Sequence, residues 1–94
     1  MESRRILVAD TGEDFRRSFV EAVRAEGDIQ VAGDTGDGVE LLRMAETQRP
    51  DVIVMEMVLT GMDGLEVLEA LPTLKLERRP RVLILSSFAK GTMA

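Results

Sequence analysis

The sequence predicts an α/β domain with an open parallel sheet, and three of its features indicate that class. Apolar runs of strand length at residues 5–9, 52–55 and 80–85 alternate with segments of helical periodicity. The resulting order is βαβαβαβ, in which each helix forms the right-handed crossover between parallel strands. The first and third strands end on a carboxylate, Asp10 and Glu56, at the edge where open α/β sheets bind ligands.

Length and composition favour one domain covering residues 1–94, near the low end of the size at which a single core suffices. No apolar run approaches the roughly 18 residues of a membrane span. The chain has no cysteine for disulfides and lacks a signal-peptide core, so we expect a cytoplasmic protein. A net charge of -5 argues against direct nucleic-acid binding by this segment.

The first half of the chain is expected to form strand 5–9, helix 12–25, a short strand 29–32 and a loop 33–38. Phe15 and Phe19 recur at helical spacing on one side of the first helix. Thr11 and Asp14 have the spacing of a capping box, which gives Thr11 a structural role. The loop glycines match neither a dinucleotide fingerprint nor a P-loop, and the loop acids do not match a calcium loop.

The second half is expected to contain a helix from residue 39 to just before Pro50, the buried strand 52–55, a helix capped by Asp63, and strand 80–85. The third helix is expected to turn Leu65, Leu68 and Leu71 toward the core. If the first and third strands are parallel neighbours, Asp10 and Glu56 project from one edge of the sheet. Two like charges so placed attract a divalent cation.

Four features taken together resemble the receiver domain of bacterial response regulators. They are the carboxylate ending strand one, the acid ending strand three, the Met62-Asp63-Gly64-Leu65-Glu66 opening of helix three, and a hydroxyl residue ending strand four. Val8-Ala9-Asp10, Pro50-Asp51-Val52 and Leu85-Ser86-Ser87-Phe88 are similar to receivers of the sporulation-regulator type, from endospore-forming bacteria. The resemblance implies a flavodoxin-like sheet of strand order 2-1-3-4-5, with the site between strands one and three.

The resemblance also implies a role for each site residue. Glu56 stands at the phosphoacceptor position and beside the metal, Asp10 at a metal-binding carboxylate, and Val58 at a main-chain metal ligand. Ser86 stands at the switch hydroxyl, and the residues that flank these motifs are Thr11, Asp63 and Gly64. The implied cofactor is Mg²⁺, which bridges phosphate oxygens to carboxylates during phosphoryl transfer.

Departures from the family pattern change what we expect of this site. Thr11 replaces the second acidic residue after strand one, which should weaken Mg²⁺ binding. Glu56 replaces the acceptor aspartate and is one methylene longer, and a misplacement near an ångström can lower an alignment-dependent rate on the order of a hundredfold. Leu59-Thr60 replaces the family's Met-Pro, which is expected to loosen the turn.

Relative to the family, helix four, strand five and helix five are missing from this sequence, so we expect a receiver that is truncated after its fourth strand. Strand 82–85 would then be an apolar edge strand, which is a pairing hazard. The face of Phe15 and Phe19 would also have less cover. Both features predict self-association of the 94-residue chain.

These features predict an atypical receiver that acts by protein contact rather than by turnover. Glu56 either mimics the phosphorylated state, or belongs to an unphosphorylated docking module, or keeps residual Mg²⁺-dependent phosphorylation. The family implies a sensor kinase or phosphotransferase as partner, and a C-terminal DNA-binding effector domain in a longer chain. The remote alternative is a retroviral-type aspartic protease, because Asp10-Thr11-Gly12 and Asp34-Thr35-Gly36 spell its motif, although helical periodicity follows both.

Overall fold

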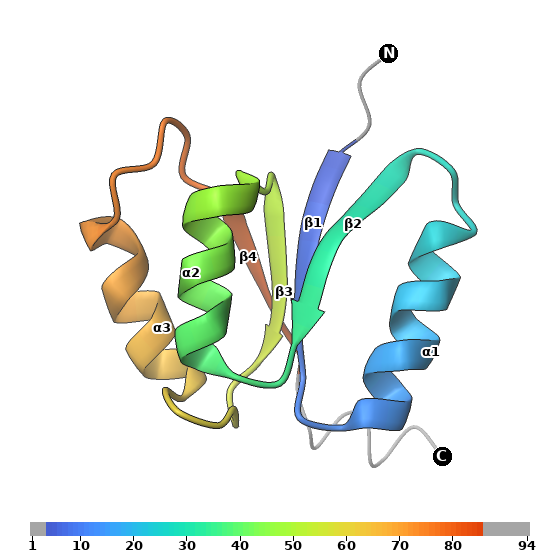
Figure 1. Ribbon diagram of the computed structural model, residues 1–94, viewed down its shortest axis with the longest axis horizontal. Helices are drawn as coiled ribbons and strands as arrows, with labels where there is room; N and C mark the ends of the chain where they lie inside the picture. The colour runs from blue at the N-terminus through green and yellow to red at the C-terminus, as the bar shows by residue number, and fades with distance from the viewer. Residues whose placement is uncertain (1–3, 86–94) are drawn as a thin grey trace.

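The computed structural model describes residues 4–85 of the 94-residue chain. Its elements follow the predicted βαβαβαβ order, with one short 3₁₀ helix, η1, after the third α-helix (Figure 1). Their bounds are β1 Arg4–Ala9, α1 Glu13–Arg24, β2 Ile29–Thr35, α2 Gly38–Gln48, β3 Val52–Glu56, α3 Gly64–Ala70, η1 Leu71–Thr73 and β4 Arg81–Leu85. The predicted α/β class is therefore confirmed.

The strands form one parallel sheet in the order β2-β1-β3-β4. β1 and β3 lie at its centre, and Ala9 of β1 pairs with Met55 of β3. Because both strands carry near-continuous apolar runs, both can be buried on two faces. Within the described residues this is the strand order that the receiver resemblance implies.

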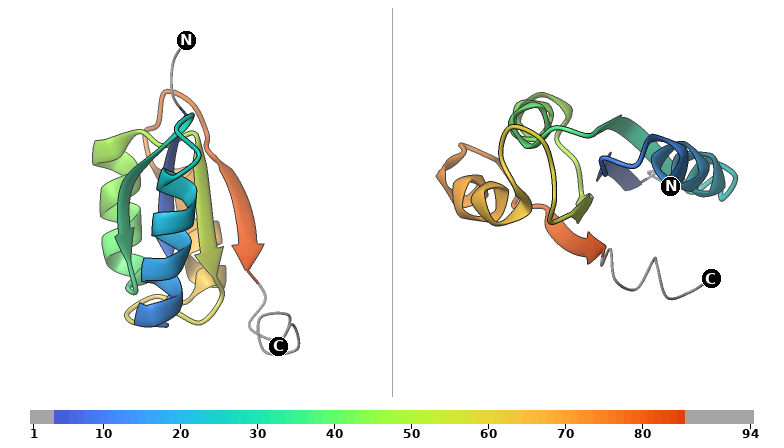
Figure 2. Two further views of the ribbon diagram at one scale, coloured as in Figure 1. Left: turned by 90° about the vertical axis from the view of Figure 1, so that its right-hand side faces the viewer. Right: turned by 90° about the horizontal axis from the view of Figure 1, so that it is seen from below.

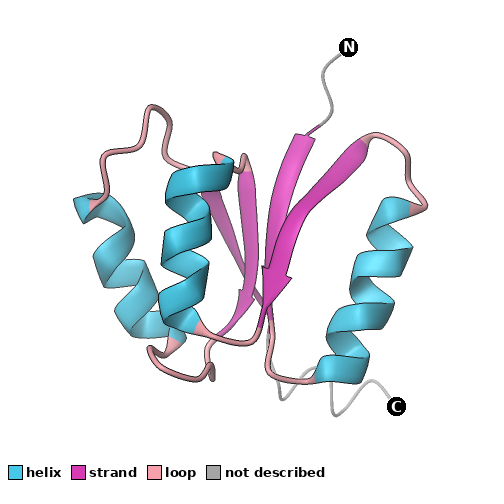
Figure 3. Ribbon diagram, in the orientation of Figure 1, coloured by secondary structure: helices cyan, strands magenta, loops and turns pink. Residues whose placement is uncertain are grey.

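Helices cover both faces of the sheet, with α1 on one face and α2 and α3 on the other (Figures 1 and 3). Figure 2 shows the same layers from the side and from below. Successive side chains of β1 alternate between the two layers. Leu7 and Ala9 belong to the core under α2 and α3, whereas Ile6 and Val8 pack with Val20 of α1.

β2 is longer than the sequence pattern indicates, because residues 33–35 continue the strand instead of forming a loop. Leu7, Val8 and Ala9 pair with Gly33, Asp34 and Thr35, after a register shift in β1 between Ile6 and Leu7. The glycine that suggested a loop serves packing here. A β-carbon on Gly33 would meet the Cε methyl of Met44, which is the flexible end of a side chain on α2, so glycine leaves room for that methyl group.

The buried face of α3 differs from the predicted one. Leu71 is buried as predicted, but Leu65 is 57% exposed and Val67 is buried instead. The face that packs on the sheet is Gly64, Val67 and Leu71, because Gly64 lies against the chain at Met57 and fixes the rotation of the helix. The expected inward placement of Leu65 is therefore wrong.

In the described part of the chain the longest α-helix, α1, has 12 residues. No helix there is long and apolar enough to cross a membrane, which takes roughly 20 residues.

Candidate functional site

Asp10 and Glu56 follow the paired residues Ala9 and Met55, so they occupy equivalent positions on adjacent parallel strands. Such strands lie about 4.8 Å apart. Both side chains are buried, with 1% of Asp10 and 6% of Glu56 exposed. The structure thus places the two carboxylates at one edge of the sheet, as the sequence predicted.

The turn between β1 and α1 is organised by Asp10 rather than by Thr11. Oδ1 of Asp10 accepts the N–H of Gly12 at 2.7 Å, and Gly12 is the N-cap of α1. Thr11 is exposed and precedes the N-cap position, so it cannot form the predicted capping box. That prediction is wrong because α1 begins one residue later than the sequence pattern indicates.

Arg16 brings a cation to this acidic edge. Its Nη1 donates to the main-chain oxygen of Asp10 at 2.6 Å, and its Nε donates to Oδ2 of Asp34 at 2.8 Å. Only 20% of the Arg16 side chain is exposed, so the guanidinium ties α1 to the ends of β1 and β2. Sequence reasoning missed this role, because an arginine on an amphipathic helix ordinarily faces solvent.

The turn between β3 and α3 is fixed by residues 36–38, contrary to the expectation that Leu59-Thr60 loosens it. The N–H of Thr60 donates to the oxygen of Gly36 at 3.1 Å, and the N–H of Gly38 donates to the oxygen of Thr60 at 2.9 Å. The Thr60 hydroxyl donates to Oδ1 of Asp37 at 2.8 Å. A proline at position 60 would supply neither donor.

Asp37 belongs to two of these contacts at once. Its Oδ2 accepts the N–H of Glu40 at 2.9 Å and caps α2, while its Oδ1 accepts the Thr60 hydroxyl. The backbone N–H of Glu40 lowers the pKa of Asp37, and the Thr60 hydroxyl lowers it further, because both bonds favour the charged form. The spacing of Asp37 and Glu40 is an N-cap signal that could have identified this residue.

Asp63 and Gly64 begin α3 as the sequence predicted. Oδ1 of Asp63 accepts the N–H of Glu66 at 2.8 Å, and the N–H of Asp63 donates to Oε1 of Glu66 at 3.2 Å. The N–H of Gly64 donates to the oxygen of Met57 at 2.6 Å. A β-carbon on Gly64 would lie 2.7 Å from Cα of Met57, so this approach requires glycine.

The remaining predicted site residues are Val58 and Ser86. Val58 lies in the turn after Glu56 with its side chain 66% exposed, and the metal-ligand role of its main chain stays a prediction. Ser86 lies outside the described residues 4–85.

The oxygen donors that the receiver resemblance predicts for Mg²⁺ are the carboxylates of Asp10 and Glu56 and the main chain of Val58. Mg²⁺ keeps several waters and is usually held by one or two carboxylates together with phosphate oxygens, so this donor set fits it. One oxygen of Asp10 already accepts the Gly12 N–H, and Thr11 adds no charge. Within residues 4–85 there is no group of three or more acidic, histidine or cysteine side chains that could hold a metal ion.

Comparison with known proteins decides the family. The model of the response regulator receiver domain matches residues 6–94. The chain belongs to this family. LiaR, a transcriptional regulatory protein of Bacillus subtilis, is 36% identical over 84 residues, which are 89% of this chain and 39% of LiaR. A protein-glutamate methylesterase/protein-glutamine glutaminase of Myxococcus xanthus is 41% identical over 69 residues, which are 73% of this chain and 20% of that protein.

Solved structures show the same receiver fold. The signal receiver domain of NarL from Mycobacterium tuberculosis superposes with a TM-score of 0.84 at 32% identity, covering 93% of this chain and 68% of that chain. The response regulator domain of Thermotoga maritima CheB gives 0.81 at 28% identity, covering 92% and 62%. The flavodoxin-like prediction is confirmed, and the aspartic protease alternative is not supported. The chain spans less than half of either relative compared by sequence.

Proposed function

We propose that this receiver signals by protein contact without phosphorylation, in the cytoplasm, with Glu56 in place of the phosphoacceptor aspartate. The observation that carries the proposal is the buried glutamate that ends β3 beside Asp10. Turnover of a small substrate is not part of this function. More narrowly, we propose a receiver of the sporulation-regulator type. This is supported by residues 8–10, 50–52 and 85–88, which are similar to receivers of that type.

A glutamate at this position supplies a fixed negative charge. Glutamate is one methylene longer than aspartate, so its carboxylate can reach toward the space that a phosphoryl oxygen would occupy on the shorter side chain. The Thr60 contacts support the same function, because they hold the turn after Glu56 through bonds that need no phosphoryl group.

The alternative is residual Mg²⁺-dependent phosphorylation, which the adjacent buried Asp10 and Glu56 favour. The intact mass of the protein from its native source, before and after incubation with acetyl phosphate and Mg²⁺, separates the two. We expect no phosphoryl adduct on the natural chain and an adduct on Glu56→Asp, which restores the shorter acceptor. An adduct on the natural chain that disappears in Glu56→Ala would overturn the proposal.

Glu56→Gln separates a mimic of the phosphorylated state from a docking module in which the charge of Glu56 has no role. The amide keeps the length of the side chain and removes its charge. If Glu56 is a mimic, hydrogen exchange of the amides in residues 57–63 should become faster in this variant. Unchanged exchange rates would refute the mimic and leave the docking module.

The partners that we propose are a sensor kinase or phosphotransferase and, in a longer chain, a C-terminal DNA-binding effector. LiaR is named a transcriptional regulatory protein and is longer than this chain, which supports the effector. Co-purification of a longer native chain with its DNA would test it.

We also propose that the 94-residue chain self-associates. β4 is an outer strand of the described sheet, and Leu83 and Ile84 on it are 58% and 44% exposed. An apolar outer strand offers unpaired main-chain groups to a second chain. Sedimentation at tens of micromolar tests this, and a monomer with cooperative unfolding would remove the idea.

A further inference from the structure

A hollow of about 270 Å³ lies at the end of the sheet opposite Asp10 and Glu56. It is formed by the end of α2, the start of β3 and the segment that leads to β4. Its apolar lining is Ala45, Pro50, Leu76 and Pro80, and its charged lining is Arg49, Asp51, Glu77 and Arg78. This volume is just below the roughly 300–1,000 Å³ of ligand pockets, so it suits a single side chain better than a large ligand.

The two arginines of the hollow are held only weakly. Arg49 pairs with Glu77 at 3.6 Å, with 74% and 80% of the side chains exposed, and Arg78 pairs with Asp51 at 3.7 Å, with 85% of Arg78 exposed. Exposed pairs of this kind contribute about 0–1 kcal/mol. Both guanidinium groups can therefore exchange their carboxylates for those of a partner.

The backbone at Arg49 supplies a second, independent observation. Arg49 is the C-cap of α2 with φ 48° and ψ 62°, and it has the only positive φ of the non-glycine residues described. This left-handed conformation favours glycine or asparagine, and an arginine there is strained. Strain that persists at a pocket rim points to a use for the side chain.

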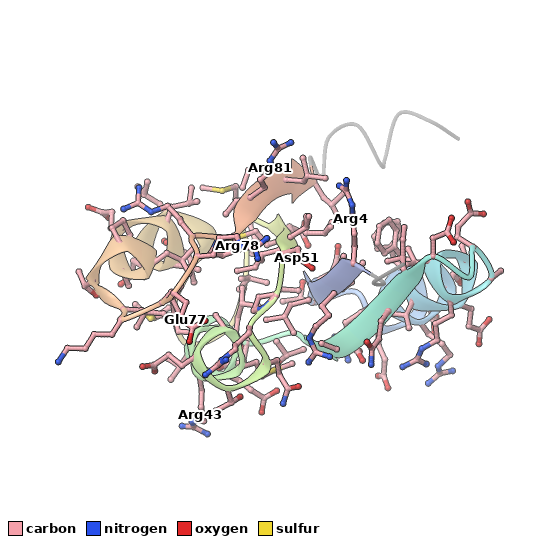
Figure 4. The ribbon with its side chains drawn as sticks, turned by 90° about the horizontal axis from the view of Figure 1, so that it is seen from above. Arg4, Arg43, Asp51, Glu77, Arg78 and Arg81 are labelled. Carbon is pink, nitrogen blue, oxygen red and sulfur yellow. The ribbon has the colours of Figure 1, made fainter. Side chains whose placement is uncertain are left out.

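Further arginines lie at the same end of the molecule as the hollow. Figure 4 shows Arg4, Arg43, Arg78 and Arg81 spread over this end of the molecule, with Asp51 and Glu77 among them. Although the whole chain carries -5, this end presents several guanidinium groups, and in the lining itself Arg49 and Arg78 lie beside Asp51 and Glu77. Charge complementarity favours an acidic occupant.

We propose that this hollow is a docking site for an acidic peptide segment of a partner protein. One apolar side chain of the segment enters the hollow over Leu76, and flanking carboxylates bind Arg49 and Arg78. The apolar floor favours a peptide over nucleic acid, whose phosphates have no use for it. In the described part the aromatic rings, Phe15 and Phe19, lie on α1 and offer no stacking platform here.

The probes are end-blocked, fluorescein-labelled peptides Asp-Glu-Leu-Glu-Asp and Asp-Glu-Ala-Glu-Asp, with fluorescence anisotropy at about 150 mM salt as the readout. We expect the leucine peptide to bind, and the alanine peptide to bind roughly tenfold more weakly because its side chain leaves the hollow empty. Amide shifts should fall on residues 45–51 and 76–80. Equal affinity for the two peptides, or no binding of either at millimolar concentrations, would overturn the proposal.

Three variants locate the binding. Arg78→Glu should weaken it roughly tenfold or more, because it replaces an attraction by a repulsion. Arg49→Gly should weaken binding while raising the melting temperature, since glycine relieves the strain at φ 48°. The matched control is Arg17→Glu, which makes the same charge change on an exposed part of α1 and should alter affinity by less than about twofold at this salt. Equal losses in Arg78→Glu and Arg17→Glu would refute a defined site.

Two other occupants are outcomes of the same experiment. Tighter binding of an oligo-dT strand that Arg78→Glu abolishes would replace the peptide by nucleic acid, and self-association that Arg78→Glu abolishes would replace it by a second copy. The inference goes beyond the proposed function and does not depend on it, because the hollow is at the opposite end of the sheet. Glu56→Ala should leave peptide affinity unchanged, whether or not acetyl phosphate forms an adduct with the natural chain.

Discussion

Gly38→Ala tests the contact between the two turns that border the candidate site. Gly38 begins α2 and donates its N–H to Thr60. A β-carbon there would lie 2.9 Å from both the carbonyl carbon and Cβ of Met62, and closer still to the carbonyl oxygen. The obstacle is backbone, so no rotamer change relieves it, and the turn of residues 57–63 must move.

The expected loss follows from opposing effects. Overpacking costs about 1–3 kcal/mol, and losing the Gly38–Thr60 hydrogen bond adds about 1 kcal/mol. Alanine is better than glycine in a helix by about 0.5–1 kcal/mol, which offsets part of this. We therefore expect a loss of about 2 kcal/mol, or roughly 8–16 °C in melting temperature for a domain of this size.

The assay is urea unfolding followed by circular dichroism, because the chain has no tryptophan or tyrosine for fluorescence. The matched control is Gly27→Ala, where φ is 77° and nothing lies within 4 Å of the added carbon. It should lose stability through backbone strain alone, with no faster hydrogen exchange at residues 60–62. A loss below about 0.5 kcal/mol in Gly38→Ala would refute the claim that these turns are fixed against each other.

Three further predictions concern the core, the acidic edge and pH. Leu41→Ala should lower the free energy of unfolding by about 2–5 kcal/mol, because Leu41 lies on the buried face of α2 and is fully buried against the sheet. A loss below about 1 kcal/mol in urea unfolding would contradict that packing. Arg16→Met should lower the free energy of unfolding by about 1–2 kcal/mol in the same assay, because it removes the contacts with Asp10 and Asp34. The exposed pair of Arg17 with Glu13 contributes little, so Arg17→Met should change stability by less than about 0.5 kcal/mol. Equal losses in the two variants would argue against the Arg16 contacts. The folded pKa of Asp37 lies below its ordinary value of 3.8, so the contribution of Asp37 to stability is present above that value and is lost as pH falls through the folded pKa. Asp37→Asn should therefore lose less stability than the natural chain between pH 7 and pH 3, and parallel losses would contradict this.

The sequence predicted the central strands and the acidic edge well because their signals are local. An apolar run that ends on a carboxylate indicates both a buried strand and the residue at which that strand ends. The sequence alone therefore places Asp10 and Glu56 on one edge, and the spacing of Asp63 to Glu66 identifies Asp63 as a cap.

The features that sequence reasoning missed depend on partners far along the chain. Thr60 contacts residues 36–38, and Arg16 contacts Asp34, so neither has a local pattern to reveal it. The sequence predicts a loop at Gly33 because glycine is a turn residue, whereas pairing with β1 continues the strand through Thr35. Leu65 was misplaced because the contact of Gly64 with Met57, and not the leucine spacing, sets the rotation of α3.

The central position of β1 has a consequence for how the chain folds as it is made. β1 leaves the ribosome before β2 and β3, which are its two neighbours in the sheet. It can pair with β2 early, but it can pair with β3 only after that later strand has been made. The main-chain N–H of Arg5 and the carboxylate of Asp51 that binds it are 46 residues apart. At 5–20 residues per second, β1 waits roughly 2–9 seconds for this neighbour. During that interval the side of β1 that later pairs with β3 is an exposed, unpaired apolar edge. A chaperone that binds such edges would bind the nascent chain in this interval.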